Sequence, residues 1–173
     1  FMANAGPEIC VMSTKIFVSQ IAWGYLLAKT VQKKYAEGKQ HLQLLADQMK
    51  TYLQNPASHE HLKKIAKQLQ DKPDIFLMGK SQNLQMMNEG MIKIIEGSYI
   101  HAHGIPAGDL KHYAITLMEK GVPVVVAVSE DVAKDDVMNA INQVKARGAE
   151  VVGIASQADP AFTYFIPVPE MGE

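Results

Sequence analysis

The chain is 173 residues long, with 17 basic and 18 acidic side chains and a formal net charge of −1 at pH 7. A chain of this length forms one domain that buries about 70% of the surface its unfolded form exposes. The charges are spread along the sequence without a basic stripe, which argues against nucleic acid and anionic membrane as main partners.

The first third of the chain predicts helices. Ser13 is expected to cap a long helix that runs to about Tyr35, and Gly38 is expected to end it. A second helix follows over residues 40–54, and Ser58 is expected to cap a third. The opening residues 1–6 have the pattern of the end of an interrupted strand and its turn, and the chain starts without an initiator Met. We therefore expect a fragment of a longer polypeptide.

From Asp74 onward the pattern alternates between strands and helices. The expected strands cover residues 75–78, 122–128, 150–155 and 163–168, and the expected helices begin near 82, 107 and 132. This alternation predicts an α/β fold with a parallel sheet that helices flank on both sides, joined by right-handed crossovers. Ligands of such sheets bind beyond the carboxyl ends of the strands.

The helix expected after residue 82 carries three charged side chains on one side. Glu89, Lys93 and Glu96 are spaced i, i+4 and i+7, so they fall within a sector of about 60°. Nearly every other position of this helix is apolar, which is typical of a buried helix. Buried charges are costly unless they are paired or used, so the three could line a cleft. A simple ladder of ion pairs on a helix surface is the alternative, and the spacing leaves both interpretations open.

One cysteine and two histidines are candidates for metal binding or other chemistry. Cys10 is the single cysteine, which excludes an internal disulfide and a cysteine zinc cluster, fits a reducing compartment, and predicts a small buried apolar residue. His101 and His103 share one face of an extended segment, and without a third ligand they are expected to be hydrogen-bonded structural residues. No apolar run approaches the ~20 residues of a membrane span, so we expect a cytoplasmic protein.

Three separated segments resemble one family in order and spacing. Residues 5–15 read A-G-P-E-I-C-V-M-S-T-K and resemble A-G-x-E-I-G-V-A-S-T-K, and residues 89–96 read E-G-M-I-K-I-I-E and resemble E-G-A-L-K-L-K-E. Residues 98–102 read S-Y-I-H-A, and residues 107–112 read A-G-D-L-K-H against A-G-E-L-K-H. Together they resemble the sugar isomerase (SIS) module of glutamine-fructose-6-phosphate aminotransferases, also called glucosamine-6-phosphate synthases.

The resemblance implies a SIS-type three-layer sandwich with a helical N-terminal segment. By its registration, residues 1–37 are the end of a preceding SIS module and a linking helix, and residues 38–173 are the second SIS domain without its C-terminal tail. The family converts fructose 6-phosphate and ammonia to glucosamine 6-phosphate by moving a proton between adjacent carbons. It implies no cofactor and no metal.

The resemblance also implies a role for each matching residue. Glu96 matches the base that moves the proton, Lys93 its electrostatic partner, and Glu89 a group that orients the lysine or a sugar hydroxyl. His112 matches the residue that opens the sugar ring, and in the family the neighbouring subunit supplies it, so a homodimer is implied.

Val11 and Ser13 match positions that contact the sugar, and Ser13, as a helix N-cap, was expected to present backbone amides to an anion.

The sequence departs from the family at several positions, and two other functions stay open. Tyr113-Ala114 stands where the family has Gly-Pro, and His103 stands where Glu is common. A regulatory SIS module that binds a phosphosugar without converting it is one alternative. A related glucosamine-6-phosphate deaminase is the other. The presence of Glu89, Lys93, Glu96 and His112 together favours the synthase over the regulator, which needs no proton transfer.

Overall fold

The computed structural model describes residues 4–169, so part of the strand end expected over residues 1–6 lies outside the described residues. The chain divides into two compact units, the first as far as His59 and the second from Glu60. The boundary expected between residues 37 and 38 stays a prediction. No helix within the described range is long and apolar enough to cross a membrane.

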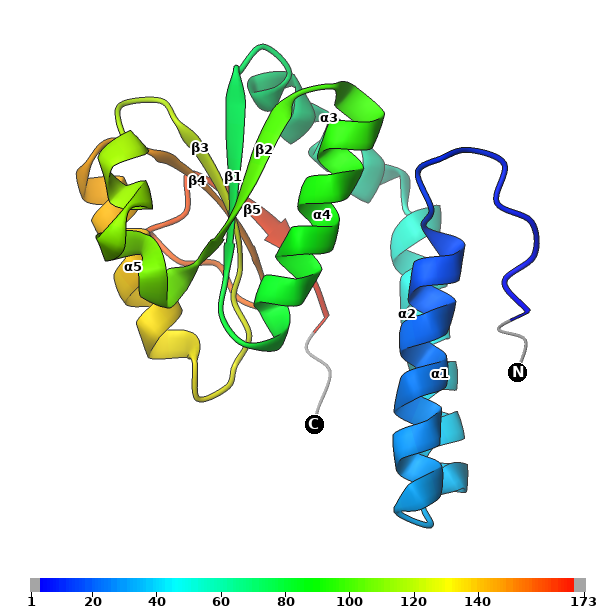
Figure 1. Ribbon diagram of the computed structural model, residues 1–173. Helices are drawn as coiled ribbons and strands as arrows, with labels where there is room; N and C mark the ends of the chain where they lie inside the picture. Colours follow the sequence, from blue (N-terminus) through cyan, green and yellow to red (C-terminus); the bar gives the residue numbers. More distant parts are fainter. Residues whose placement is uncertain (1–3, 170–173) are drawn as a thin grey trace. The chain divides into compact units, whose positions relative to one another are not determined.

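The first unit is a helical hairpin of α1 (Lys15–Val31) and α2 (Tyr35–Gln54) (Figure 1). Gly38 does not end a helix, as the sequence predicted, but lies buried inside α2. A Cβ at Gly38 would come within 2.9 Å of the Lys29 Cβ, so the glycine allows the two helices to approach closely. The chain instead reverses just before α2, where Lys33 has a φ of 61°.

The third helix, α3 (Pro56–Leu69), starts two residues before the expected cap at Ser58. The Asn55 side-chain oxygen accepts a hydrogen bond from the backbone N–H of Ala57 at 3.0 Å. Proline is favoured at the first helical position because it has no N–H to satisfy there. Asn55 and Pro56 therefore start the helix together.

The second unit contains a five-stranded sheet in the order β2-β1-β3-β4-β5, and every neighbouring pair is parallel. Its strands are β1 (Asp74–Gly79), β2 (His101–Pro106), β3 (Pro123–Ala127), β4 (Glu150–Ala155) and β5 (Tyr164–Pro167). The predicted α/β class is confirmed. The strand order reverses between β1 and β3, which is where parallel sheets of this kind open a crevice at their carboxyl edge.

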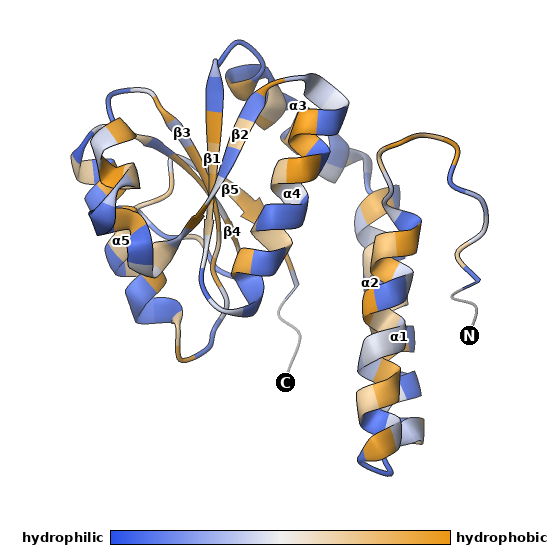
Figure 2. Cartoon of the chain, viewed as in Figure 1, coloured by the Kyte–Doolittle hydropathy of each residue, from blue (hydrophilic) through white to orange (hydrophobic). Residues whose placement is uncertain are grey.

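Helices cover both faces of the sheet (Figure 1). One apolar cluster joins the sheet to α3 and α4 (Gln82–Ser98) through residues such as Ile65, Leu77 and Met87. The other cluster joins it to α5 (Lys134–Ala146) and to the segment after β2, with Leu110 and Ile141 fully buried. Figure 2 shows hydrophobic residues on the central strands, and hydrophobic and hydrophilic residues alternating along the covering helices.

The helix predicted over residues 107–120 is wrong. The segment forms two short 3₁₀ helices, η1 (Ala107–His112) and η2 (Ala114–Leu117). Leu110, Ala114 and Met118 are all buried and lie four residues apart, which imitates the apolar stripe of an α-helix. Tyr113 interrupts the helix between them, with a φ of −151°.

Helix α5 also begins differently from the prediction. The sequence predicts Ser129 as the cap of a helix from about residue 132, but the helix starts at Lys134 with Ala133 at its N-cap position and no side-chain cap bond. In the turn before it, the Asp131 carboxylate accepts a hydrogen bond from the N–H of Ala133 at 2.8 Å. The Ser129 hydroxyl instead accepts a bond from the Asn83 side-chain amide at 2.7 Å. Serine is a good cap residue, but Ser129 is engaged with Asn83 of α4.

Candidate functional site

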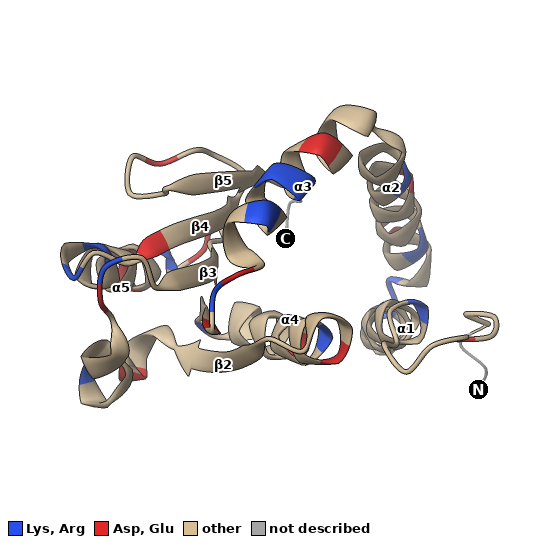
Figure 3. Ribbon diagram, turned by 90° about the horizontal axis from the view of Figure 1, so that it is seen from above, with Lys and Arg blue, Asp and Glu red and all other residues tan. Residues whose placement is uncertain are grey.

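The three charged residues of α4 form one connected ion-pair group, called the α4 triad below. The Nζ of Lys93 lies 2.7 Å from Oε2 of Glu96 and 3.4 Å from Oε1 of Glu89. The three side chains are between 22 and 28% exposed, so each is largely covered without being buried. Figure 3 shows the acidic and basic positions next to one another on α4. The predicted grouping is therefore observed.

Close packing on the sheet determines the direction in which the side of α4 that carries the triad points. A Cβ at Gly90 would lie 3.2 Å from Cδ2 of Leu77, so the glycine brings the helix close to β1. Met87 is buried on the same side. In a helix with 100° between residues, this contact places the triad well away from the sheet.

Helix α4 is less buried than its composition predicted. Met86, Ile92 and Ile95 are each 40% exposed, and Met87 is its single buried residue. The expectation of a helix covered on nearly every side is therefore wrong. Whether the α4 triad lines a cleft stays a prediction.

The ion pairs change the titration of Lys93. Its hydrogen bond to Glu96 is the main cause that raises the pKa of Lys93, and the charge of Glu89 acts in the same direction, while partial burial opposes both. The ammonium group therefore stays protonated throughout the neutral range. A fixed positive charge 2.7 Å from a carboxylate can stabilise negative charge that develops on a substrate oxygen beside them.

His112 lies at the end of η1, on the other face of the sheet from α4. Its neighbours Leu110 and Ala114 belong to the apolar cluster that includes α5, whereas Met87 of α4 belongs to the opposite cluster. The imidazole is exposed, and within residues 4–169 it has no hydrogen-bond partner. A single copy of the second unit therefore does not bring His112 to the α4 triad.

Val11 and Ser13 precede α1 in the first unit. Val11 is 86% exposed and Ser13 is partly exposed. Ser13 is not the helix cap that the sequence predicted, because Thr14 holds the N-cap position and no side chain caps the helix. The N–H of Thr14 donates to the carboxylate of Glu8 at 2.7 Å. The expected burial of Cys10 is also wrong, because this residue is exposed.

Polar side chains at the carboxyl ends of β1 and β3 are paired with one another. Asn83 donates to Ser129, and Lys80 forms an ion pair with Asp136. Ser81, between β1 and α4, has φ 53° and ψ −124°, a backbone conformation that favours glycine. This edge, where ligands of parallel sheets bind, is thus built from polar groups and a strained turn.

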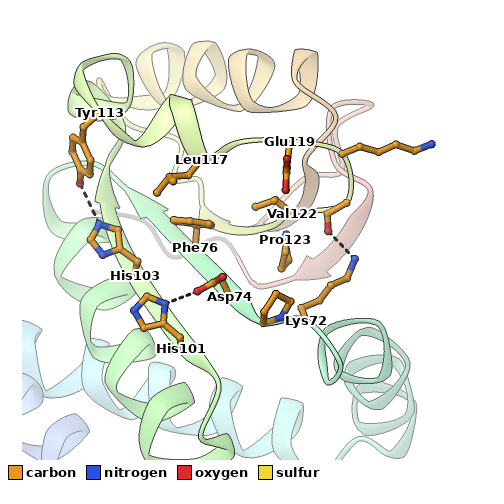
Figure 4. A pocket seen from close by; sticks show the side chains of 13 residues that line it. Lys72, Asp74, Phe76, His101, His103, Tyr113, Leu117, Glu119, Val122 and Pro123 are labelled. Atoms are coloured by element: carbon orange, nitrogen blue, oxygen red, sulfur yellow. Dashed lines mark hydrogen bonds and ion pairs between the residues drawn. The ribbon is translucent and has the colours of Figure 1, made fainter.

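A cavity of about 560 Å³ lies at the opposite edge, where β1, β2 and β3 begin. Its lining includes Asp74, Phe76, His101, His103, Tyr113, Leu117, Glu119, Val122 and Pro123 (Figure 4). No residue of the α4 triad lines it, and neither does His112.

No pattern in the sequence predicts this cavity. The one available signal was the pair His101 and His103, which share a face of β2. The expectation that both are hydrogen-bonded is confirmed, since His101 bonds Asp74 at 2.5 Å and His103 contacts the Tyr113 hydroxyl at 3.4 Å. Over the described part of the chain, no three His, Cys, Asp or Glu residues gather into a metal site.

Fold and sequence comparison together define the class of this protein. The SIS domain family matches residues 68–162, which is more than half of the chain, and the observed parallel sheet with helices on both faces agrees with that match. The chain belongs to the SIS domain family.

Particular relatives share one name. The chain is 38% identical over 162 residues to the isomerizing glutamine–fructose-6-phosphate aminotransferase of Fusobacterium nucleatum, covering 88% of this chain and 26% of that protein. It is 35% identical over 166 residues to the enzyme of the same name from Corynebacterium glutamicum, covering 91% of this chain and 27% of that protein. The chain thus spans about a quarter of the length of the curated relatives it matches.

Solved structures agree with this relationship. The C-terminal domain of glucosamine-fructose-6-phosphate aminotransferase from Francisella tularensis superposes with a TM-score of 0.85 at 26% identity, over 97% of this chain and 50% of that one. Tagatose-6-phosphate ketose/aldose isomerase from Escherichia coli gives a TM-score of 0.63 at 14% identity, over 93% of this chain and 44% of that one, and shares the fold.

Proposed function

We propose that this chain is the isomerase part of a glutamine–fructose-6-phosphate aminotransferase, which converts fructose 6-phosphate and ammonia to glucosamine 6-phosphate in the cytoplasm. The α4 triad is the observation that carries the proposal. Its three side chains are joined by two ion pairs on one helix, and they match three of the four charged positions of the family motif, the fourth being Ile95 here. The relatives' shared name supports the same activity.

The proposed proton transfer uses two groups of the α4 triad directly. The Glu96 carboxylate takes a proton from one carbon of the opened sugar and returns it to the adjacent carbon. Lys93, held 2.7 Å from Glu96, stabilises the negative charge that develops on the sugar oxygen during this step. Glu89 forms an ion pair with the same ammonium group at 3.4 Å and so helps to orient the Lys93 side chain.

The proposal places His112 in the active site of a neighbouring copy. His112 lies on the opposite face of the sheet from the α4 triad, so one copy of the second unit cannot use both on one sugar. In a homodimer in which each copy supplies its His112 to the other, the α4 triad of one copy and His112 of its partner act on the same sugar. An exposed imidazole has one nitrogen that can donate a proton and one that can accept it, which suits ring opening. Val11 and Ser13 are proposed to contact the sugar.

A single substitution tests the central role of Glu96. In the complete encoded polypeptide, Glu96→Gln should lower the rate of glucosamine 6-phosphate formation by about 10²- to 10⁴-fold, the usual contribution of a general base. Binding of fructose 6-phosphate, measured by calorimetry, should change little, because the amide keeps the shape of the carboxylate.

Glu150→Gln is the matched control. Glu150 also pairs with a lysine, Lys72 at 3.2 Å, but it lies at the start of β4 and outside the α4 triad. Its loss should leave the rate nearly unchanged. Wild-type turnover by the Glu96→Gln protein would remove Glu96 from the reaction, and tight sugar-phosphate binding without any turnover by the wild type would favour a regulatory module.

A further inference from the structure

We propose that Tyr113, through its contact with His103, is a positioning residue that holds the adjacent His112 for ring opening. This inference rests on the proposed role of His112. The Tyr113 hydroxyl lies 3.4 Å from Nε2 of His103, and the two rings meet edge to face with centroids 6.1 Å apart and an interplanar angle of 87°. Figure 4 shows the two side chains reaching toward each other from β2 and from the segment after η1.

The sheet provides a fixed base for this contact. His103 lies beside Phe76 in the register of β1 and β2, and their rings also meet edge to face, at 6.1 Å and 76°. Phe76 is only 7% exposed and belongs to the main apolar cluster. A row of three rings therefore connects the buried sheet to Tyr113, and edge-to-face pairs of this kind are favourable beyond the area they bury.

The backbone around His112 is held on both sides but not at His112 itself. Leu110 and Ala114 are fully buried, and the Tyr113 carbonyl accepts bonds from the N–H and the hydroxyl of Thr116 at 3.2 and 2.6 Å. The His112 side chain has no hydrogen-bond or ion-pair partner among residues 4–169. The position of its imidazole therefore depends on the backbone that the Tyr113 ring anchors, which sets the direction of the His112 Cα–Cβ bond.

The two residues in contact are two of the positions where this sequence departs from the family. A Gly-Pro pair after the histidine would restrict this turn covalently, because proline fixes its own φ and limits the residue before it. Tyr113-Ala114 has no such restriction. The His103–Tyr113 contact supplies a non-covalent restriction in its place, so the two departures compensate each other.

The mobility of His112 tests the contact in this chain. Tyr113→Ala should increase the fast backbone motion of Lys111 and His112, measured as lower amide order parameters by ¹⁵N NMR relaxation, while the strands stay unchanged. Tyr113→Phe should stay close to the wild type, because 3.4 Å is a long hydrogen bond and the ring contact carries most of the effect.

A second Tyr–His pair offers a matched control. In the helical hairpin, the Tyr25 hydroxyl lies 2.6 Å from Nδ1 of His41. Tyr25→Ala removes a contact of the same type in the other compact unit, and it should not change the order of His112. A thermal melt of each variant shows whether it is folded.

Turnover in the complete polypeptide tests the positioning role. Tyr113→Ala should lower kcat on the order of 10-fold with little change in KM, since small displacements of a catalytic group cost rate more than binding. Tyr113→Phe, which keeps the ring, should retain most of the rate.

An unchanged amide order parameter at His112 in a folded Tyr113→Ala protein would overturn the inference. A Tyr113→Ala protein whose KM rises while its kcat stays at the wild-type value would also overturn it. These failures differ from failure of the proposed function. If Glu96→Gln abolishes turnover while Tyr113→Ala changes neither order nor kcat, only the inference about Tyr113 falls.

Discussion

The α4 triad and the segment that carries His112 are held in place in different ways. The triad lies on one regular helix, and its spacing alone brings Lys93 within 2.7 and 3.4 Å of two carboxylates. The His112 segment consists of two 3₁₀ helices separated at Tyr113, and buried side chains and a ring contact with β2 determine its path. Local geometry thus sets the first region, and tertiary contacts set the second.

The largest expected effect is a difference between the two regions in how much stability a mutation to alanine removes. Leu110→Ala should lower the free energy of unfolding of the second unit by about 2–5 kcal/mol, because the side chain is fully buried and leaves a cavity. Ile95→Ala in α4 should cost less than about 1 kcal/mol, because Ile95 is 40% exposed.

Urea unfolding followed by the methyl NMR signals of Val124 and Ile141 measures both losses. These residues are fully buried in the second unit, whereas the single tryptophan, Trp23, lies in the first unit and does not report on it. Equal losses for the two variants would show that tertiary packing does not distinguish the regions.

The same division explains what the sequence could predict. The strands were predictable because their apolar runs are short and lie between turn signals, and β3 is buried at four of its five residues. The α4 triad was predictable because i, i+4 and i+7 neighbours meet on any helix. Both predictions use information within a few residues of the chain.

Tertiary competition decides the features that were predicted wrongly or missed. The apolar spacing of Leu110 and Ala114 fits an α-helix, yet Tyr113 turns away to contact a residue ten positions earlier. The cavity at the amino edge joins the starts of three strands, which no local pattern describes. Glycine is common at helix ends, but Gly38 lies inside α2, where its missing side chain allows close contact with Lys29 of α1. The local sequence does not show this contact.

A smaller effect concerns the backbone strain in the turn that leads into α4. Ser81 precedes α4 with a φ of 53°, and a Cβ at Gly79 would come within 2.8 Å of the Asn83 backbone, so the chain turns very tightly here. Ser81→Gly should stabilise the second unit by about 1 kcal/mol, because glycine adopts this conformation without strain.

Ser98→Gly in the last turn of α4 should have the opposite sign. Ser98 has ordinary helical geometry and donates a hydrogen bond to the carbonyl of Ile94 at 2.6 Å, so glycine there should cost about 0.5–1 kcal/mol. Destabilisation by Ser81→Gly in urea unfolding would mean that the backbone at Ser81 is not strained.

The smallest expected effect concerns the pH dependence of the α4 triad. The pKa of Lys93 is raised above its ordinary value of 10.5, first by its hydrogen bond to Glu96 and then by charge interactions with Glu96 and Glu89. The folded state therefore binds the proton more tightly than the unfolded state. This contribution is fully present below pH 10.5 and is lost as the pH rises through the higher folded pKa. Solvent screening keeps it small, since the side chains are about a quarter exposed.

Lys93→Met should reduce the loss of stability that sets in as the pH rises above 10.5, measured by urea unfolding of the second unit. Some loss should remain, because the Glu130 carboxylate raises the pKa of Lys134 in the same way. Lys111→Met, in the exposed His112 segment, leaves both ion pairs in place and should keep the wild-type profile. If Lys93→Met also keeps that profile, the pairs in α4 do not couple to folding, and their close spacing follows from helix geometry without contributing to the stability of the site.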